Sequence, residues 1–465
     1  MEEKNQAQQL KDQLFYKKTN ALEKMSAEEK AEMRAYAEGY RRFLDTAKIE
    51  REAVKAGVAM AEAEGYTEFR FGMKLERGGK YYYNNRGKAL YVFAVGTRPL
   101  EDGIHITAAH VDSPRLDLKP NPLYENNGIC YLKTHYYGGI KKFQWATVPL
   151  ALHGTVTRRD GSTVDVVIGE DESDPIVYVS DLLIHLSKDQ MGRSLADCFP
   201  GENLNLIVGT EPMEGADSDK IKLNVMNLLH EKYGIVEEDL ISAELTAVPA
   251  AKARYIGLDR SLIGGYGHDD RVCAYTELTG FFADKEHART AMVILADKEE
   301  VGSTGVTGMQ SEAFDDLIEE ICSQLGANCA QVRAASRCLS ADVSAGFDPN
   351  FGEAFELRNN STINGGVVVC KYTGARGKSG TSDATGEFLG WVRSMLNDAG
   401  VTWQISELGK VDQGGGGTVA AYIAQKNIDT IDVGVPVLSM HSPYEVISAA
   451  DLYMTHRAFE AFNKA

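Results

Sequence analysis

Hydrophobic and polar positions change their spacing twice along the chain. Up to about residue 65, apolar residues such as Leu44 and Val54 recur at roughly helical spacing among charged ones. This pattern predicts amphipathic helices that cover one face of a core. Strand-like runs follow between 80 and 114, where an apolar segment ends at a proline.

Between about 116 and 240 the pattern changes to alternating polar and apolar residues. Glycine and aspartate turns separate these segments, and few long helical periods interrupt them. We therefore expect a mostly β insertion over 116–245. The flanking segments, 1–115 and 246–465, would then form one discontinuous domain.

From about 250 to the C-terminus, helical periods alternate with short apolar strands. Such alternation predicts an α/β fold with a parallel-rich mixed sheet flanked by helices, and with ligands at the carboxyl ends of its strands. The expected strands are 290–296, 336–344 and 427–438, and the expected helices are 271–284, 309–326, 382–400 and 448–464.

Composition narrows the classes of function. The 465 residues carry 49 Lys and Arg against 67 Asp and Glu, a formal charge of -18, which argues against sequence-independent binding to nucleic acid or to an anionic membrane. There is no N-terminal signal-like apolar core and no run of eighteen apolar residues, so we expect a cytoplasmic protein. The seven cysteines form no Cys-x-x-Cys pair and are expected to be reduced core thiols rather than zinc ligands.

Five segments place acidic or histidine side chains at or just after an expected strand or turn. Each signal is weak alone, because a buried histidine with a structural partner, a helix cap or a pair of solvated acids would look the same. Together they supply only nitrogen and oxygen donors. The candidate residues are His110 and Asp112, His268 and Asp269, Glu299 and Glu300, Asp342, and His441.

This set of donors suits a pair of borderline divalent ions, most simply Zn²⁺, with Co²⁺ or Mn²⁺ as substitutes. Two such ions can polarise a carbonyl and supply a nucleophile at neutral pH. Of the adjacent carboxylates Glu299 and Glu300, one can bind a metal while its neighbour acts as the general base. This would explain why an apolar strand ends in two acids.

The order of these motifs over nearly the whole chain resembles the aspartyl aminopeptidase family of dinuclear zinc aminopeptidases, and the chain looks like a bacterial member. The resemblance implies that Glu299 is the general base and that Asp112 orients His110. It also implies an inserted dimerisation domain at about 116–245, a homo-oligomer in the form of a tetrahedral dodecamer, and short peptides as substrates. The implied ligands are His110, Asp269 and Asp342 for one ion and Asp269, Glu300 and His441 for the other.

Some segments depart from the family pattern. Gly267–Asp270 reads Gly-His-Asp-Asp instead of Arg-Leu-Asp-Asn, which brings His268 next to the expected bridging aspartate. Ala345 and Asp348 stand where histidines are expected, whereas the later Lys371 is kept. We therefore expect Lys371 and His268 to contact substrate, and we do not extend the family's preference for an acidic N-terminal residue to this chain.

Other functions have weaker support. Residues 374–380 lack the first glycine of a phosphate loop, which would fall at Tyr372, and Ser303 and Ser382 have no histidine at a suggestive spacing. The glycine run at 413–420 fits amides that bind a substrate or close packing of chain segments equally well. The preferred hypothesis is a metalloaminopeptidase; a dinuclear-metal amidase or deacylase and a non-catalytic assembly protein remain alternatives.

Overall fold

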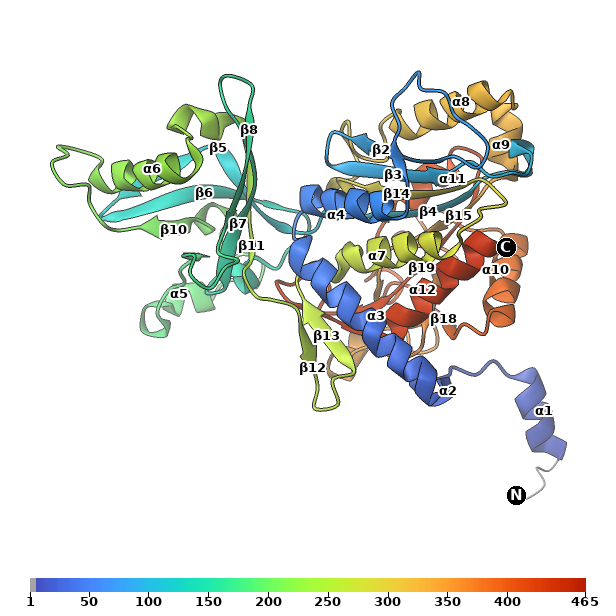
Figure 1. Cartoon of the computed structure of the whole chain (residues 1–465). Coiled ribbons are helices and arrows are strands. Elements are labelled where there is room, and N and C mark those ends of the chain that lie inside the picture. The colour runs from blue at the N-terminus through green and yellow to red at the C-terminus, as the bar shows by residue number, and fades with distance from the viewer. Residues whose placement is uncertain (1–5) are drawn as a thin grey trace.

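The computed structural model describes residues 6–465 and consists of two parts side by side (Figure 1). A nine-stranded sheet with helices on both faces forms the larger part. Residues 115–249 form the smaller part, which leaves the larger one after β4 and returns to it after β11. The expected helical segment 1–65 extends beyond the described residues at its first five positions.

The central sheet is mixed: its four middle strands are parallel, the pairs β2–β3, β3–β14 and β17–β19 are antiparallel, and the outermost pairs β1–β2 and β17–β18 are again parallel. Strands β14, β4, β15 and β19 are adjacent and parallel, which confirms the predicted parallel-rich α/β fold. In spatial order the strands are β1 (Thr67–Glu68), β2 (Lys80–Asn85), β3 (Ala89–Ala94), β14 (Ala291–Ala296), β4 (His105–His110), β15 (Arg337–Ser340), β19 (Asp429–Gly434), β17 (Val367–Cys370) and β18 (Trp403–Ile405).

Successive side chains of each central strand enter two different cores. In β14, Val293 and Leu295 join the core on one face, while Met292 and Ile294 join the core on the other. This period of two explains why the strand is apolar throughout. The first face is covered by α2 (Ala21–Lys24), α3 (Ala27–Thr46), α4 (Glu50–Ala63), α7 (His268–Ala283), α10 (Gly386–Asp398) and α12 (Ala449–Lys464), and the second by α8 (Ala313–Leu325), α9 (Cys329–Ala335) and α11 (Ala420–Ala424).

The smaller part is an antiparallel sheet with a core of its own. Besides its linear order β11-β5-β6-β10-β9-β7-β8, β11 also pairs with β7, so that the sheet closes on itself. Helix α6 (Lys220–Tyr233) packs against it, although the alternating pattern had predicted few helices here. Its strands are β5 (Arg115–Asn126), β6 (Ile129–Tyr137), β7 (Pro149–Thr157), β8 (Thr163–Ile168), β9 (Val177–Tyr178), β10 (Leu206–Gly209) and β11 (Ala243–Pro249).

A third, small sheet lies beside the central one and was not expected. The predicted strand 427–438 breaks after β19, and its second half becomes β20 of this sheet. This change of sheet carries the chain to His441. The strands are β12 (Arg254–Ile256), β13 (Leu262–Gly265), β21 (Glu445–Ser448), β20 (Pro436–Leu438) and β16 (Ser344–Ala345).

Outside these layers lie helix α1 (Gln6–Leu14) and the four-residue α5 (Lys188–Met191), which belongs to the smaller part. Among residues 6–465 no helix is long and apolar enough to cross a membrane.

Candidate metal centre

The carboxyl ends of the parallel strands bring the candidate residues to one place. His110 is the last residue of β4, and Asp342 follows β15 by two residues. Glu299 and Glu300 lie in a short 3-10 helix, η6 (Glu299–Val301), just after β14. In a parallel sheet these ends share one edge, which is where α/β proteins bind their ligands.

The carboxylate of Asp269 lies between two histidines. Its Oδ1 is 3.1 Å from Nε2 of His110, and its Oδ2 is 3.1 Å from Nε2 of His441. His110 belongs to the central sheet, whereas His441 lies between strands β20 and β21 of the small third sheet. One carboxylate oxygen therefore faces each histidine, which is the arrangement expected of a bridging ligand.

Two groups of potential ligand atoms share Asp269. His110, Asp269 and Asp342 place ligand atoms within 4.8 Å of one another, and so do Asp269, Glu300 and His441. Glu300 Oε1 is buried and makes no hydrogen bond, and the buried Asp269 Oδ1 faces only Nε2 of His110. Buried carboxylate oxygens normally have a partner, and the donors of both groups fit bound cations.

Burial shifts the acid–base equilibria of the site. It raises the pKa of Glu299 to about 7, and it raises the pKa values of Glu300 and Asp342 well above the usual range, with nearby carboxylates adding to each effect. His441 is also buried, but its hydrogen bond to Asp269 and the charge of Glu300 outweigh burial and raise its pKa to about 10. The site thus concentrates carboxyl groups whose ionised forms bound cations would stabilise.

Asp112 makes hydrogen bonds to His110 and to the loop that contains Glu299 and Glu300. Its carboxylate accepts hydrogen bonds from the backbone N–H groups of Glu299 (3.1 Å, to Oδ1) and Glu300 (3.2 Å, to Oδ2). Nδ1 of His110 lies 2.9 Å from the carbonyl oxygen of Asp112 and 3.4 Å from its Oδ1. Asp112 therefore fixes the His110 ring mainly through its main chain, while its carboxylate holds the loop with the two glutamates.

Glu299 is placed differently from its neighbour. Its Oε2 is 3.9 Å from Nε2 of His110, outside both ligand groups, and its side chain is 17% exposed. Glu300 is 4% exposed and has Oε2 3.6 Å from Nε2 of His441. Both adjacent acids thus face the same centre. Glu300 belongs to a ligand group, whereas Glu299 belongs to neither.

Sequence reasoning missed several residues that hold the centre. The buried carboxylate of Glu445 accepts hydrogen bonds from the backbone N–H groups of Asp269 (3.0 Å) and His441 (2.7 Å). The hydroxyl of Tyr137 donates to Oδ2 of Asp112 at 2.7 Å. Glu445 comes four residues after His441 and could have been noticed, whereas nothing local distinguishes Tyr137 from its tyrosine neighbour.

Two predicted substrate residues lie outside the two ligand groups. His268 is fully buried, with Nδ1 2.7 Å from the hydroxyl of Tyr40 on α3, and this burial lowers the pKa of its imidazole to about 3. Because it packs under that helix, its position does not support substrate contact. Lys371 follows β17 and pairs with Asp383 at 2.5 Å, and its role in substrate binding stays a prediction.

The glycine run at 413–420 packs closely against other segments. A Cβ at Gly415 would lie 2.2 Å from the carbonyl oxygen of Gly374, and one at Gly414 would lie 2.0 Å from that of Leu408. The helix that follows, α11, has only five residues. The structure therefore supports the packing explanation for these glycines.

A cavity of about 650 Å³ adjoins the centre on the His441 side. Apolar side chains dominate its wall, including Ile140, Phe351, Phe355 and Met440, and Lys141 and Asp348 also reach it.

Comparison with known proteins identifies the family. The model of the aminopeptidase I zinc metalloprotease family (M18) matches residues 43–463. A probable M18 family aminopeptidase 1 from Clostridium acetobutylicum is 46% identical over 452 residues, which cover 95% of this chain and 97% of that protein.

Solved structures agree with this assignment. The M18 aminopeptidase of Thermotoga maritima has a TM-score of 0.92 at 40% identity, covering 97% of this chain and 99% of its own. The fold is also shared by the S. cerevisiae mApe1 dodecamer, with a TM-score of 0.76 at 20% identity and coverage of 92% and 96%. The chain therefore belongs to the M18 family of zinc metalloaminopeptidases, hydrolases that act on peptide bonds, as its sequence motifs predict.

Proposed function

We propose that the enzyme works with two divalent ions bridged by Asp269. The observation that carries this proposal is the Asp269 carboxylate between Nε2 of His110 and Nε2 of His441, at 3.1 Å from each. Asp342 completes the first group, and Glu300 completes the second. Zinc fits the nitrogen and oxygen donors and the family, and bound ions would polarise the scissile carbonyl and lower the pKa of water.

Glu299 would move the proton. Its carboxylate is close to His110 yet belongs to neither ligand group, and Asp112 fixes its backbone. It can accept a proton from the attacking water and then pass that proton to the leaving amine. Asp112 would be a positioning residue, because it reaches the centre only through His110 and the loop after β14.

The substrates would be short peptides with a free N-terminus and an apolar side chain near the scissile bond. The cavity beside His441 lies next to the proposed centre, and its wall is largely apolar. Apolar side chains gain from entering such a pocket, whereas an acidic one would lose its hydration there.

We expect unblocked leucyl and phenylalanyl anilides and dipeptides to be hydrolysed faster than aspartyl and glutamyl ones. Chelation should abolish cleavage, and added zinc, cobalt or manganese should restore it. The measurement is kcat/KM over this panel before chelation, after chelation and after each metal is added back.

N-acetylated versions of the same substrates are the matched control. An aminopeptidase needs the free amine, so acetylation should remove activity. Equal rates on blocked and unblocked substrates would instead support the amidase or deacylase. No cleavage by protein shown to contain its metals would support the non-catalytic assembly protein.

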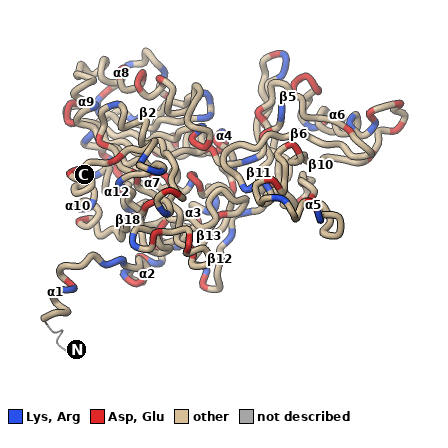
Figure 2. The backbone as a smooth tube through the Cα atoms, turned by 180° about the vertical axis from the view of Figure 1, so that it is seen from behind, with Lys and Arg blue, Asp and Glu red and all other residues tan. Residues whose placement is uncertain are grey.

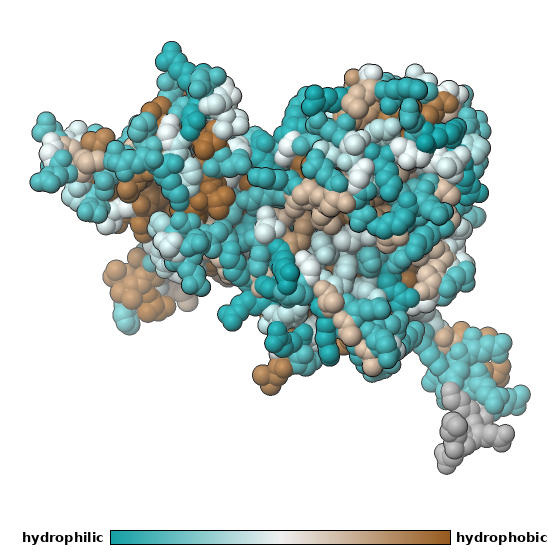
Figure 3. All heavy atoms as spheres, in the orientation of Figure 1, coloured by the Kyte–Doolittle hydropathy of each residue, from teal (hydrophilic) through white to brown (hydrophobic). Residues whose placement is uncertain are grey.

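The enzyme would act as a homo-oligomer whose contacts include residues 116–245, as a dimerisation domain. Figure 3 shows hydrophobic residues gathered at the lower edge of the smaller part, where Figure 1 places α5. Leu186 and Met191 are 69% and 71% exposed there. Exposed apolar groups of this kind mark interaction sites, and the dodecamer of the fold relative from S. cerevisiae suggests twelve copies as the final state.

Light scattering should give a mass several times that of one chain. The double variant Leu186→Asp, Met191→Asp should shift it toward smaller species, because charge is costly to bury at an interface. Leu258→Asp is the matched control, since Leu258 is fully exposed on the larger part. A stable monomer of the unmodified chain would contradict the proposal.

Other features fit a cytoplasmic enzyme without nucleic acid or membrane partners. All seven cysteines are free, which suits a reducing compartment. In the view of Figure 2, basic and acidic segments are interspersed along both parts, in keeping with the net charge of -18.

A further inference from the structure

The end of strand β6 reaches from the smaller part into the metal centre. Three consecutive residues there, Tyr137, Gly138 and Gly139, each lie against a different residue of the site. The sheet that contains β6 is otherwise separate from the central sheet. This contact therefore places part of the smaller domain in the immediate surroundings of the proposed ligands.

Tyr137 acts through the carboxylate of Asp112. Its hydroxyl donates to Oδ2 of Asp112 at 2.7 Å, the oxygen that also accepts the backbone N–H of Glu300. Its ring is covered by the guanidinium of the buried Arg115, which lies 4.2 Å from the ring centre. A tyrosine held in this way restricts the rotation of the Asp112 carboxylate.

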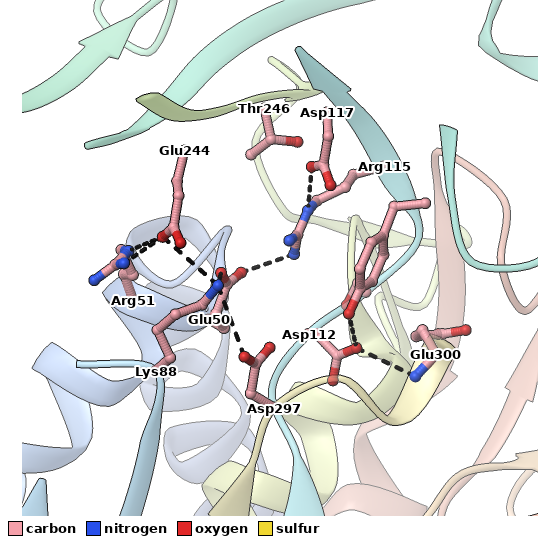
Figure 4. Close-up of polar contacts among 12 residues, drawn as sticks. Glu50, Arg51, Lys88, Asp112, Arg115, Asp117, Glu244, Thr246, Asp297 and Glu300 are labelled. Carbon is pink, nitrogen blue, oxygen red and sulfur yellow. Dashed lines mark hydrogen bonds and ion pairs between the residues drawn. The ribbon is translucent and has the colours of Figure 1, made fainter. Parts of the chain in front are cut away.

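Arg115 is itself fixed between the two parts. It pairs with Glu50 of α4 and with Asp117 of β5, at 2.7 Å in each case. Figure 4 shows Glu50 between Arg115 and Lys88, with Lys88 directed toward Asp297. Because Asp297 lies two residues before Glu299, this network joins the smaller part to the glutamate loop from a second side.

Gly138 and Gly139 act on the His441 side. The carbonyl oxygen of Gly139 lies 2.8 Å from Nδ1 of His441, which leaves Nε2 facing Asp269. Gly138 has φ +74°, and a Cβ there would lie 3.2 Å from Oε2 of Glu300 and 3.3 Å from Cγ of Pro114. Only glycine fits here without pressing on Glu300.

We propose that Tyr137–Gly139 is a positioning segment by which the smaller domain orients both halves of the metal centre. Tyr137 would hold the carboxylate of Asp112, which lies beside His110 and fixes the loop with Glu300, and Gly138 and Gly139 would set the half that contains Glu300 and His441. Outer partners of this kind tune metal affinity. The inference rests on the proposed pair of ions and adds a role for the inserted domain beyond dimerisation.

The test is zinc affinity by chelator competition on the full chain. Asp342→Asn and Glu300→Gln, which each change one ligand group, assign the two binding steps. Tyr137→Phe should weaken both zinc steps by about 10- to 100-fold, because the Asp112 carboxylate lies beside His110 and also holds the loop with Glu300. Tyr136→Phe is the matched control, because Tyr136 is adjacent on β6 and 40% exposed, and it should bind zinc like the unmodified enzyme.

Gly138→Ala should weaken the step of the His441 group, because the added methyl presses on Glu300. Gly128→Ala is its control at the other end of β6. Gly128 has φ +82° and nothing within 4 Å of an added Cβ, so it has the same backbone strain without the contact. Zinc binding by Gly128→Ala should match that of the unmodified enzyme.

Melting temperatures of the metal-free proteins separate positioning from folding. If Tyr137→Phe or Gly138→Ala lowers this temperature while its zinc binding is unchanged, that residue is only structural and its part of the proposal is wrong. If Tyr137→Phe and Gly138→Ala bind zinc with the same affinities as their matched controls, the proposal is also wrong. A single zinc step in the unmodified enzyme would instead contradict the pair of ions itself.

Discussion

We expect Glu299→Gln to lower kcat by about 10²- to 10⁴-fold, the usual contribution of a general acid–base group. The amide has nearly the same shape as the carboxylate but cannot accept a proton from water. Because Glu299 lies outside both ligand groups, the variant should keep the metal content of the unmodified enzyme. The measurements are kcat on an unblocked leucyl anilide and metal content by elemental analysis of the same samples.

Glu319→Gln provides the matched control. Glu319 belongs to α8 and its side chain is 64% exposed, so the same chemical change there should leave kcat as it is. Unchanged kcat in Glu299→Gln would remove Glu299 from the mechanism. A lowered metal content would show instead that Glu299 is a ligand, and the two adjacent acids would then need new roles.

The positions of the expected strands predicted much of this centre, because several of its residues come at or just after a short apolar run in the sequence. The apolar run before Glu299 indicated a buried strand, and two acids directly after it were unusual enough to suggest chemistry. His110 and Asp342 also come at or just after such runs. Since parallel strands end at one edge, their position in sequence was sufficient to place them together.

Other parts depend on contacts between distant segments, which one sequence does not encode locally. Tyr137 reaches Asp112 only because the smaller part folds back on the central sheet. His268 stands next to Asp269 in sequence, yet helix α3 covers it through Tyr40. Proximity in sequence therefore gave no sign of Tyr137, and it did not reveal that His268 is buried against α3.

Asp269→Asn should remove both ions at once. The amide keeps the size of the side chain but loses the negative charge that faces His110 and His441. Outer partners already contribute about 10- to 100-fold to metal affinity, so a shared ligand should contribute at least about 100-fold to each ion. Zinc titration of the metal-free variant should therefore show neither tight step, and hydrolysis of the leucyl anilide should be lost.

Asp342→Asn is the control that makes this result specific, because Asp342 belongs to one ligand group only. The Asp342→Asn variant should lose one of the two tight zinc-binding steps and keep the other. Zinc should raise the melting temperature of the unmodified enzyme, since an ion at 100 times its Kd adds about 2.7 kcal/mol of stability. Asp269→Asn should show no such rise. If it kept one ion at unchanged affinity, Asp269 would serve a single ion, and the two histidines would belong to separate sites rather than to one bridged centre.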